Sequence, residues 1–183
     1  VGKTLCAQLN NIRQGKCRSY NLPFSIEAVY EYDLDCSTSD LEQWCAECDF
    51  VFNLAGVNRP QNTEEFMQGN FGFISDMLSM LIKYNNKAPI IGSSSIQAAL
   101  DNPYGLSKKA GEDLMFSYGK ETGAKVLVYR LPNVFGKWCK PNYNSVVATF
   151  CNNIANDLDI TINDENIMLD LIYIWLNSIF LSN

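Results

Sequence analysis

Residues 93 to 108 read SSSIQAALDNPYGLSK, and this stretch joins the end of one element to the start of the next. The apolar residues 89–92 predict a short strand that ends at the three serines. Pro103 can open a helix, because the first helical position needs no backbone N–H. Tyr104 and Lys108 stand four residues apart and would share one face of that helix. The stretch therefore predicts a strand, a loop and a helix that bring hydroxyls, a phenol and an ammonium group together.

Predicted strands and helices alternate on both sides of this stretch. Apolar or alternating runs predict further strands at residues 25–32, 49–54 and 125–130. Helical spacing of apolar residues predicts helices at residues 3–13, 39–48, 64–84, 103–121 and 145–156. Ser37 or Ser39 is available as an N-cap, and Gly69 and Gly72 weaken the middle of the long helix. The sequence thus predicts an α/β fold with a parallel sheet covered on both faces, whose ligands bind beyond the carboxyl ends of the strands.

Composition limits the possible functions. With 183 residues, of which 47% are hydrophobic, the chain has the size and core of one domain. The net charge of −6 argues against a nucleic-acid surface, and no apolar run approaches the roughly 20 residues that span a bilayer. Seven irregularly spaced cysteines, Cys45 and Cys48 among them, and the absence of histidine predict reduced thiols, a cytoplasmic protein and no metal site.

The Tyr-x-x-x-Lys spacing allows two interpretations. Chance alone would supply roughly half of one such pair in this chain, so an ordinary helix with Tyr and Lys on one face is the simpler interpretation. The functional interpretation is a proton donor. A nearby Lys⁺ would lower the phenol pKa from about 10, and a serine hydroxyl would hydrogen-bond the substrate oxygen. Such a device needs a hydride donor, which implies a nicotinamide cofactor.

Several motifs together resemble a known superfamily. Ser93 to Ser95, Tyr104-x-x-x-Lys108, the strand end NLAG at residues 53–56 and the run RLPNVFG at residues 130–136 resemble the extended short-chain dehydrogenase/reductases that act on nucleotide sugars. Asn70 matches the helix asparagine of that superfamily's active site. More narrowly, AGVNRP at 55–60, SSSIQ at 93–97 and FGKWCKPNYNS at 135–145 are similar to the capsular polysaccharide reductases that make the UDP-N-acetyl-L-fucosamine precursor.

This resemblance implies a Rossmann-like doubly wound parallel sheet. It also implies NAD(P)H-dependent reduction of the 4-keto group of a UDP-linked deoxy amino sugar, for capsular or cell-surface polysaccharide biosynthesis. The implied catalytic residues are Ser95, Tyr104 and Lys108. The implied contacts of NADP(H) or NAD(H) are Gly2, Asp33, Leu54, Ala55, Gly56, Tyr104, Lys108, Pro132 and Asn133. The implied contacts of the UDP-sugar are Asn58, Arg59, Ser94, Asn133, Lys137, Trp138, Asn142 and Tyr143.

Several of these residues allow a second interpretation, and more than one function fits the motifs. Asp33 either faces the adenosine ribose, which would favour NAD, or is a solvated turn acid. The loop around Trp138 and Tyr143 is either a nucleotide-sugar clamp or a packed Ω-loop. The competing functions are a nucleotide-sugar 4-epimerase, a 4,6-dehydratase, and a non-catalytic fragment or redox-sensing module. A dehydratase needs an acid pair near the catalytic residues, which the sequence Ser95-Ile96-Gln97 does not offer.

Both ends of the chain depart from the family pattern. Val1-Gly2-Lys3 resembles the end of the Gly-x-x-Gly-x-x-Gly motif, so we expect the first strand and two glycines to be missing. Residues 175–183 stand where the family continues with an Asp-Asp pair, and by this resemblance we expect the family's C-terminal metal-binding cupin domain to be missing from this chain. We therefore expect an incomplete reductase domain at 1–174 with weak cofactor binding, a divergent tail at 175–183, and a homodimer in the full-length protein.

Overall fold

The computed structural model describes residues 1–17 and 22–174. The chain forms two compact units, one of residues Val1–Val29 together with the segment from Pro132 onward, and one of residues Tyr30–Leu131. The predicted tail at 175–183 lies outside the described residues, and the assignment of 1–174 to one reductase domain stays a prediction. Among the described residues, no helix is both long and apolar enough to cross a membrane.

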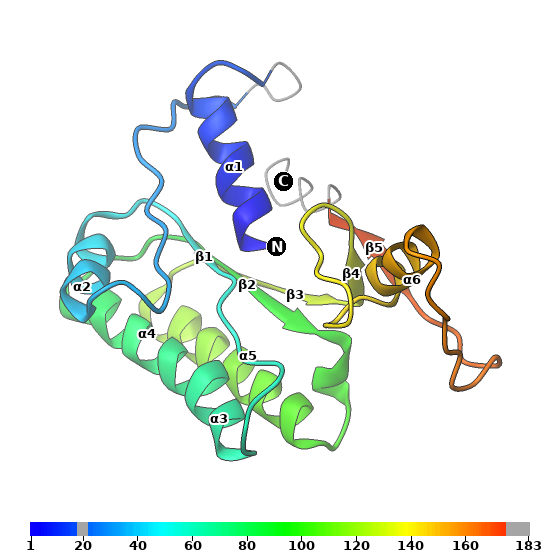
Figure 1. The fold of residues 1–183 in the computed structure, drawn as a ribbon. Helices are drawn as coiled ribbons and strands as arrows, with labels where there is room; N and C mark the ends of the chain where they lie inside the picture. The colour runs from blue at the N-terminus through cyan, green and yellow to red at the C-terminus, as the bar shows by residue number, and fades with distance from the viewer. Residues whose placement is uncertain (18–21, 175–183) are drawn as a thin grey trace. The chain divides into compact units, whose positions relative to one another are not determined.

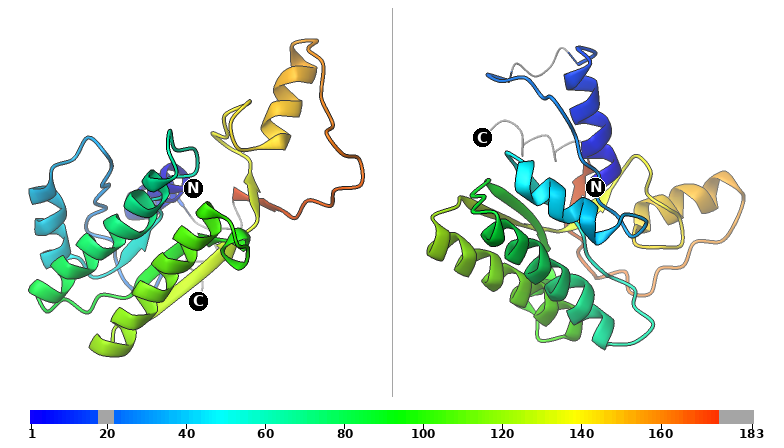
Figure 2. Two further views of the ribbon diagram at one scale, coloured as in Figure 1. Left: turned by 90° about the horizontal axis from the view of Figure 1, so that it is seen from below. Right: turned by 90° about the vertical axis from the view of Figure 1, so that its left-hand side faces the viewer.

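The unit Tyr30–Leu131 is built on a three-stranded parallel sheet of order β1-β2-β3. The strands are β1 (Val51–Asn53), β2 (Ile90–Ser95) and β3 (Val126–Leu131). The helical elements are α2 (Thr38–Glu47), α3 (Glu64–Met67), the π-helical segment η1 (Gln68–Gly72), α4 (Phe73–Lys83), the 3₁₀ turn η2 (Ile96–Ala99) and α5 (Pro103–Thr122). Helices α4 and α5 lie side by side along one face of the sheet (Figures 1 and 2).

The hydrophobic core of this unit lies where α2, α4 and α5 meet the sheet. Leu81 and Ile90 are almost fully buried, and Met115 packs between α5 and the sheet. The other core residues are Leu41, Cys45, Ile74, Met77, Leu78, Tyr118 and Ala124. Such close packing fixes the helices on the strands and so fixes the start of α5 at the carboxyl end of β2.

The other unit contains α1 (Gly2–Arg13), α6 (Val146–Ala155) and a parallel pair of short strands, β4 (Asn133–Phe135) and β5 (Leu171–Tyr173). Ser145 caps α6, because its hydroxyl accepts a hydrogen bond from the Ala148 N–H at 3.3 Å. Gly136 adopts a φ of +125°, and a Cβ there would lie 2.6 Å from the Tyr173 ring. Only glycine therefore allows the chain to leave β4 against β5.

The structure confirms the predicted α/β class with a parallel sheet. Helices α1, α2, α5 and α6 begin and end within one or two residues of their predicted bounds, and Ser37 is the N-cap of α2. The serines 93–95 belong to β2 itself rather than to the loop after it. The predicted strand at 25–32 is wrong, since a strand needs a paired neighbour and the described sheets contain none for this segment.

Candidate active site

Ser95 is the last residue of β2 and the N-cap of η2. Its hydroxyl oxygen accepts a hydrogen bond from the Gln97 N–H at 3.2 Å. The same hydroxyl lies close enough to the Tyr104 phenol to act on its pKa. The turn after β2 therefore brings the first two predicted catalytic residues near each other.

Tyr104 is placed by the first turn of α5. Asn102 caps this helix by accepting from the Gly105 N–H at 2.8 Å, and Pro103 fills the first helical position. The Tyr104 ring packs against the Phe66 ring with 5.6 Å between centroids. Burial raises the pKa of the Tyr104 phenol, and the nearby Ser95 hydroxyl opposes this shift only in part. We expected Lys108 to lower this pKa, so the direction is a correction.

Lys108 lies one helical turn further along α5. Its ammonium donates a hydrogen bond to the Ser93 carbonyl oxygen at 3.2 Å. Burial lowers the pKa of Lys108, because desolvation disfavours its charge, and the carboxylate of Glu112 partly offsets that effect. A Cβ on Gly56 would lie 3.0 Å from the Lys108 Nζ atom and 2.7 Å from the Asn70 Oδ1 atom. The glycine at the end of β1 thus leaves room for the ammonium group.

Asn70 ties the loop after β1 to α5. Its side chain, 1% exposed, lies in the π-helical segment η1. The Asn70 amide accepts from the Val57 N–H and donates to the Val57 carbonyl, both at 2.9 Å, and donates to the Ser107 hydroxyl at 3.0 Å. Ser107 in turn donates to the Tyr104 carbonyl at 2.8 Å. Asn70 therefore holds the backbone that carries the phenol.

The remaining predicted residues of this unit lie around the ends of β1 and β2. Leu54, Ala55 and Gly56 directly follow β1, and Asn58 and Arg59 are exposed on the next loop. Asp33 is an exposed turn residue whose carboxylate accepts from the Leu34 N–H at 2.8 Å. Ser94 is 8% exposed, and its hydroxyl lies near Glu112 without making a hydrogen bond within the described chain. The predicted role of Ser94 in substrate binding stays a prediction.

The other predicted residues belong to the unit that contains α1 and β4. Trp138 is half exposed, and the Lys137 ammonium lies 4.4 Å above its ring centroid. The Asn142 N–H donates to the Thr149 hydroxyl at 2.9 Å, which anchors the loop to α6. Lys137 and Trp138 also line a small cavity of about 80 Å³ beside α1. Gly2 lies at the start of α1, and Pro132, Asn133 and Tyr143 lie along the segment 132–143.

Glu112 is a residue of this site that the motifs did not indicate. Its carboxylate is 3% exposed and receives a forked pair of hydrogen bonds from Arg130 at the end of β3. The spacing Tyr104, Lys108, Glu112 is a signal that could have identified it, since residues four apart share one face of a helix.

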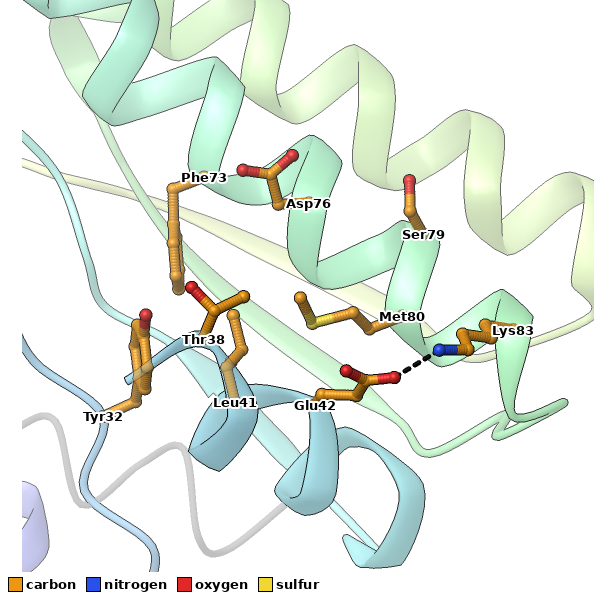
Figure 3. A pocket seen from close by; sticks show the side chains of 9 residues that line it. All are labelled: Tyr32, Thr38, Leu41, Glu42, Phe73, Asp76, Ser79, Met80 and Lys83. Carbon is orange, nitrogen blue, oxygen red and sulfur yellow. Dashed lines mark hydrogen bonds and ion pairs between the residues drawn. The ribbon is translucent and has the colours of Figure 1, made fainter. Parts of the chain in front are cut away.

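A separate groove of about 520 Å³ lies between α2 and α4 (Figure 3). Leu41, Phe73 and Met80 form its apolar wall, and Tyr32 stacks on Phe73 with 5.7 Å between ring centroids. An ion pair between Lys83 and Glu42 lies at one end. None of the predicted site residues lines this groove, so it is not the site of the expected chemistry.

The cysteine pair does not have the properties of a redox centre. Cys45 is 4% exposed, and burial raises its pKa to about 11. Burial also raises the pKa of Cys48. Reactive thiols are accessible and have lowered pKa values, so this geometry disfavours a redox-sensing module. In the described residues, no group of three or more His, Cys, Asp or Glu side chains is arranged to hold a metal ion.

Known proteins similar to this chain include a reductase and a capsule-assembly protein. A curated relative, UDP-2-acetamido-2,6-beta-L-arabino-hexul-4-ose reductase from Pseudomonas aeruginosa, is 44% identical over 95% of this chain and 44% of its own length. The crystal structure of the capsular polysaccharide assembling protein CapF from Staphylococcus aureus matches with a TM-score of 0.76 and 40% identity, over 95% of this chain and 46% of CapF. The chain thus spans less than half the length of both proteins.

A more distant structure, RMD from Pseudomonas aeruginosa complexed with NADPH, is 22% identical with a TM-score of 0.70 over 94% of this chain and 69% of its own. At that identity the likeness concerns the fold alone, which is Rossmann-like. The family model described as the NAD dependent epimerase/dehydratase family matches residues 1–174. The chain belongs to the NAD dependent epimerase/dehydratase family.

Proposed function

We propose that this chain supplies the catalytic residues for NAD(P)H-dependent reduction of the 4-keto group of a UDP-linked deoxy amino sugar, in cell-surface polysaccharide biosynthesis. The observation that carries the proposal is that Ser95 ends β2, Tyr104 begins α5 close to it, and Lys108, one turn further along, is hydrogen-bonded to Ser93 of the same strand. The name and 44% identity of the curated reductase support the same substrate class. Because the chain spans less than half of that relative, the activity is proposed for the complete protein.

Each residue of the trio has a distinct part in this proposal. The raised pKa keeps the Tyr104 phenol protonated near neutral pH, so it can donate its proton to the carbonyl oxygen of the substrate. The Ser95 hydroxyl orients the phenol and hydrogen-bonds the same oxygen as negative charge develops there. Lys108, which follows Tyr104 by one turn on α5, would stabilise the phenolate that remains after proton transfer through its positive charge.

The residues around the trio suit a nicotinamide cofactor, which supplies the hydride when bound. The Lys108 ammonium makes one hydrogen bond to the described chain, with the Ser93 carbonyl, so it keeps further N–H donors for ribose hydroxyls. Leu54, Ala55 and Gly56 would hold the cofactor at the end of β1, and Gly2, Asp33, Pro132 and Asn133 are further proposed contacts. An acidic Asp33 favours NAD(H) and the resemblance favours NADP(H), so the proposal includes both.

The proposed sugar contacts are Asn58, Arg59, Asn133, Lys137, Trp138, Asn142 and Tyr143. We also propose that the complete protein is cytoplasmic and a homodimer. Leu106 and Phe116 on α5 are about half exposed, and a second copy would remove such large apolar side chains from water. A 4-epimerase or 4,6-dehydratase is the alternative within the family, and no acidic side chain of η2 supports the dehydratase.

Replacing Tyr104 by Phe in the complete protein tests the proposal. The variant keeps the ring that packs on Phe66 but loses the proton donor, so turnover of a UDP-4-keto-6-deoxy sugar should fall by about 10²–10⁴-fold. NADPH oxidation followed by absorbance measures turnover, and circular dichroism verifies the fold. Tyr84→Phe is the matched control, because that hydroxyl bonds Glu42 outside the site. Full activity of Tyr104→Phe would show that another group donates the proton.

A further inference from the structure

Glu112 and Arg130 form a forked ion pair beneath the catalytic trio. The Arg130 Nε atom donates to Glu112 Oε1 at 2.9 Å, and the Arg130 NH2 nitrogen donates to Glu112 Oε2 at 2.7 Å. The Glu112 side chain is 4% exposed and the Arg130 side chain is 42% exposed. Ionising a carboxylate that has lost so much of its water is costly, and the planar guanidinium offsets that cost with two parallel hydrogen bonds.

This ion pair closes a ring of contacts that includes Lys108. Glu112 follows Lys108 by one turn on the same face of α5. Arg130 stands opposite Ser94 in the β2–β3 register, and the neighbouring residue Ser93 accepts the hydrogen bond of Lys108. The ring therefore runs from Lys108 through β2 to β3 and returns along α5, so Glu112 and the acceptor of the Lys108 hydrogen bond are tied to the same part of the sheet.

The charges in this ring act in a definite direction. Burial disfavours the charge on Lys108, and the Glu112 carboxylate opposes that effect. Burial is the largest influence on the Glu112 carboxyl and would raise its pKa, but the hydrogen bonds and charge of Arg130, the nearby Ser94 hydroxyl and the charge of Lys109 together outweigh it, so the pKa lies below its usual value. The other charged groups that act on the pair are Lys109 and Asp113, which form an exposed ion pair with each other. On the other side of Lys108, Gly56 and Asn70 are uncharged.

We propose that Glu112 is a positioning residue of this active site, whose carboxylate, clamped by Arg130, keeps the Lys108 ammonium charged and seated beside Ser93. Its effect on turnover rests on the proposed function, whereas its effect on the protonation of Lys108 does not. Arg130 serves to hold the carboxylate. The hydrogen bonds described for the Glu112 carboxylate come from Arg130, and we expect Glu112 to act through Lys108 rather than on the substrate.

A direct test follows the titration of Lys108 by NMR of the chain labelled with ¹³Cε-lysine. Lys108→Met identifies the signal. Glu112→Gln removes the negative charge with little change in shape, so the titration midpoint of Lys108 should fall below that of the wild type. Arg130→Met removes the clamp but leaves the carboxylate, which is ionised at these pH values, so the midpoint should not fall. An unchanged midpoint in Glu112→Gln, or an equal fall in Arg130→Met, would refute the proposal.

A second comparison covers a failure of Glu112→Gln to fold, since breaking a buried ion pair is costly. The double variant Glu112→Gln/Arg130→Met differs from Arg130→Met only in the carboxylate. Its Lys108 midpoint should be lower than that of Arg130→Met, and equal midpoints would overturn the proposal.

The catalytic consequence is measured in the complete protein as turnover against pH. On the alkaline side of the pH profile, Glu112→Gln should lose turnover at a lower pH than the wild type, with kcat affected more than KM. Glu112→Asp keeps the negative charge and should lose turnover at the wild-type pH. A shifted NMR titration without any reductase activity would contradict the proposed function and leave the positioning role standing. If Glu112→Gln instead keeps normal activity and loses it at the same alkaline pH as the wild type, the positioning role is refuted and the proposed function stands.

Discussion

Burial is the largest influence on the protonation of both Tyr104 and Lys108. It raises the pKa of the phenol and lowers that of the ammonium, so it favours the neutral form of each side chain. The higher pKa keeps the phenol protonated but makes it a weaker acid, and a neutral Lys108 would not stabilise the phenolate that proton transfer leaves. The site therefore needs a negative charge near Lys108 and none near Tyr104, which is the arrangement that Glu112 provides.

The buried thiol of Cys45 gives a pH-dependent prediction of stability. Its pKa rises from an ordinary value of 9.0 to about 11 in the folded chain. Between these values the folded state keeps a proton that the unfolded state has lost, so stability should decrease as pH rises through this range. Two pKa units correspond to at most about 2–3 kcal/mol.

Urea unfolding at several pH values from about 8 to 11 measures this effect. Cys45→Ala should be less stable than wild type at pH 8 because of the cavity, and should then lose stability less steeply as pH rises. The exposed Cys151→Ala is the control and should follow the wild-type slope. Parallel curves for wild type and Cys45→Ala would mean that this thiol does not titrate differently in the two states.

At the scale of elements, the contact between η2 and α5 sets the distance from Ser95 to Tyr104. A Cβ at Gly105 would lie 2.2 Å from the Gln97 carbonyl oxygen and 2.5 Å from that of Leu100. Both obstacles are backbone atoms, which a change of rotamer cannot move. Gly105→Ala should therefore shift the start of α5 away from η2, lower the melting temperature and separate the two catalytic hydroxyls.

The control for this substitution is Gly72→Ala. Gly72 also has helical backbone angles, and a Cβ there would meet nothing closer than 4.0 Å. Ala has the higher helix propensity, so this variant should be as stable as the wild type or more stable. Differential scanning calorimetry compares the melting temperatures of the two variants with that of the wild type. Equal melting temperatures would show that the close approach of η2 and α5 does not constrain the site.

The elements with local sequence signals were the predictable ones. Helix α5 was predicted from Pro103 at its start and the helical spacing of the residues after it, and helix α2 from its Ser37 cap. These signals lie in neighbouring residues, and both helices lie where expected. Residues 25–32 have strand-like alternation but no paired neighbour in the described sheets, and β4 forms because it pairs with β5 almost forty residues later. Pairing of distant segments cannot be read from a single window of sequence.

The same limit applied to the active site. The trio was predictable from its motifs and its place at a strand end. The Glu112–Arg130 pair was not, because it joins a helix to a strand across the sheet surface. The burial that raises the Tyr104 pKa is likewise a property of the packed structure. The size of a groove would not have indicated the trio either, since the large groove between α2 and α4 holds none of it.

At the scale of the whole molecule, buried apolar residues are divided unequally between the two units. All members of the main hydrophobic core belong to the unit Tyr30–Leu131. In the described part of the other unit, Leu5 and Ile174 are the buried apolar residues, and α6 buries none of its side chains. Since local opening is opposed mainly by buried contacts, the proposed catalytic trio lies in the unit that should open least.

Native-state hydrogen exchange measures this difference. After correction for intrinsic rates, the amides of β2 and of the middle of α5 should exchange most slowly, and those of α6 much faster. Met115→Ala removes a side chain that is 2% exposed in the core, which should cost about 2–5 kcal/mol and speed exchange in β2. Because that core lies within Tyr30–Leu131, exchange in α6 should stay unchanged.

Ile174→Ala is the matched change in the other unit and should leave β2 protected. If Met115→Ala accelerates α6 as much as β2, the two units unfold together and the assignment of stability to one of them is wrong.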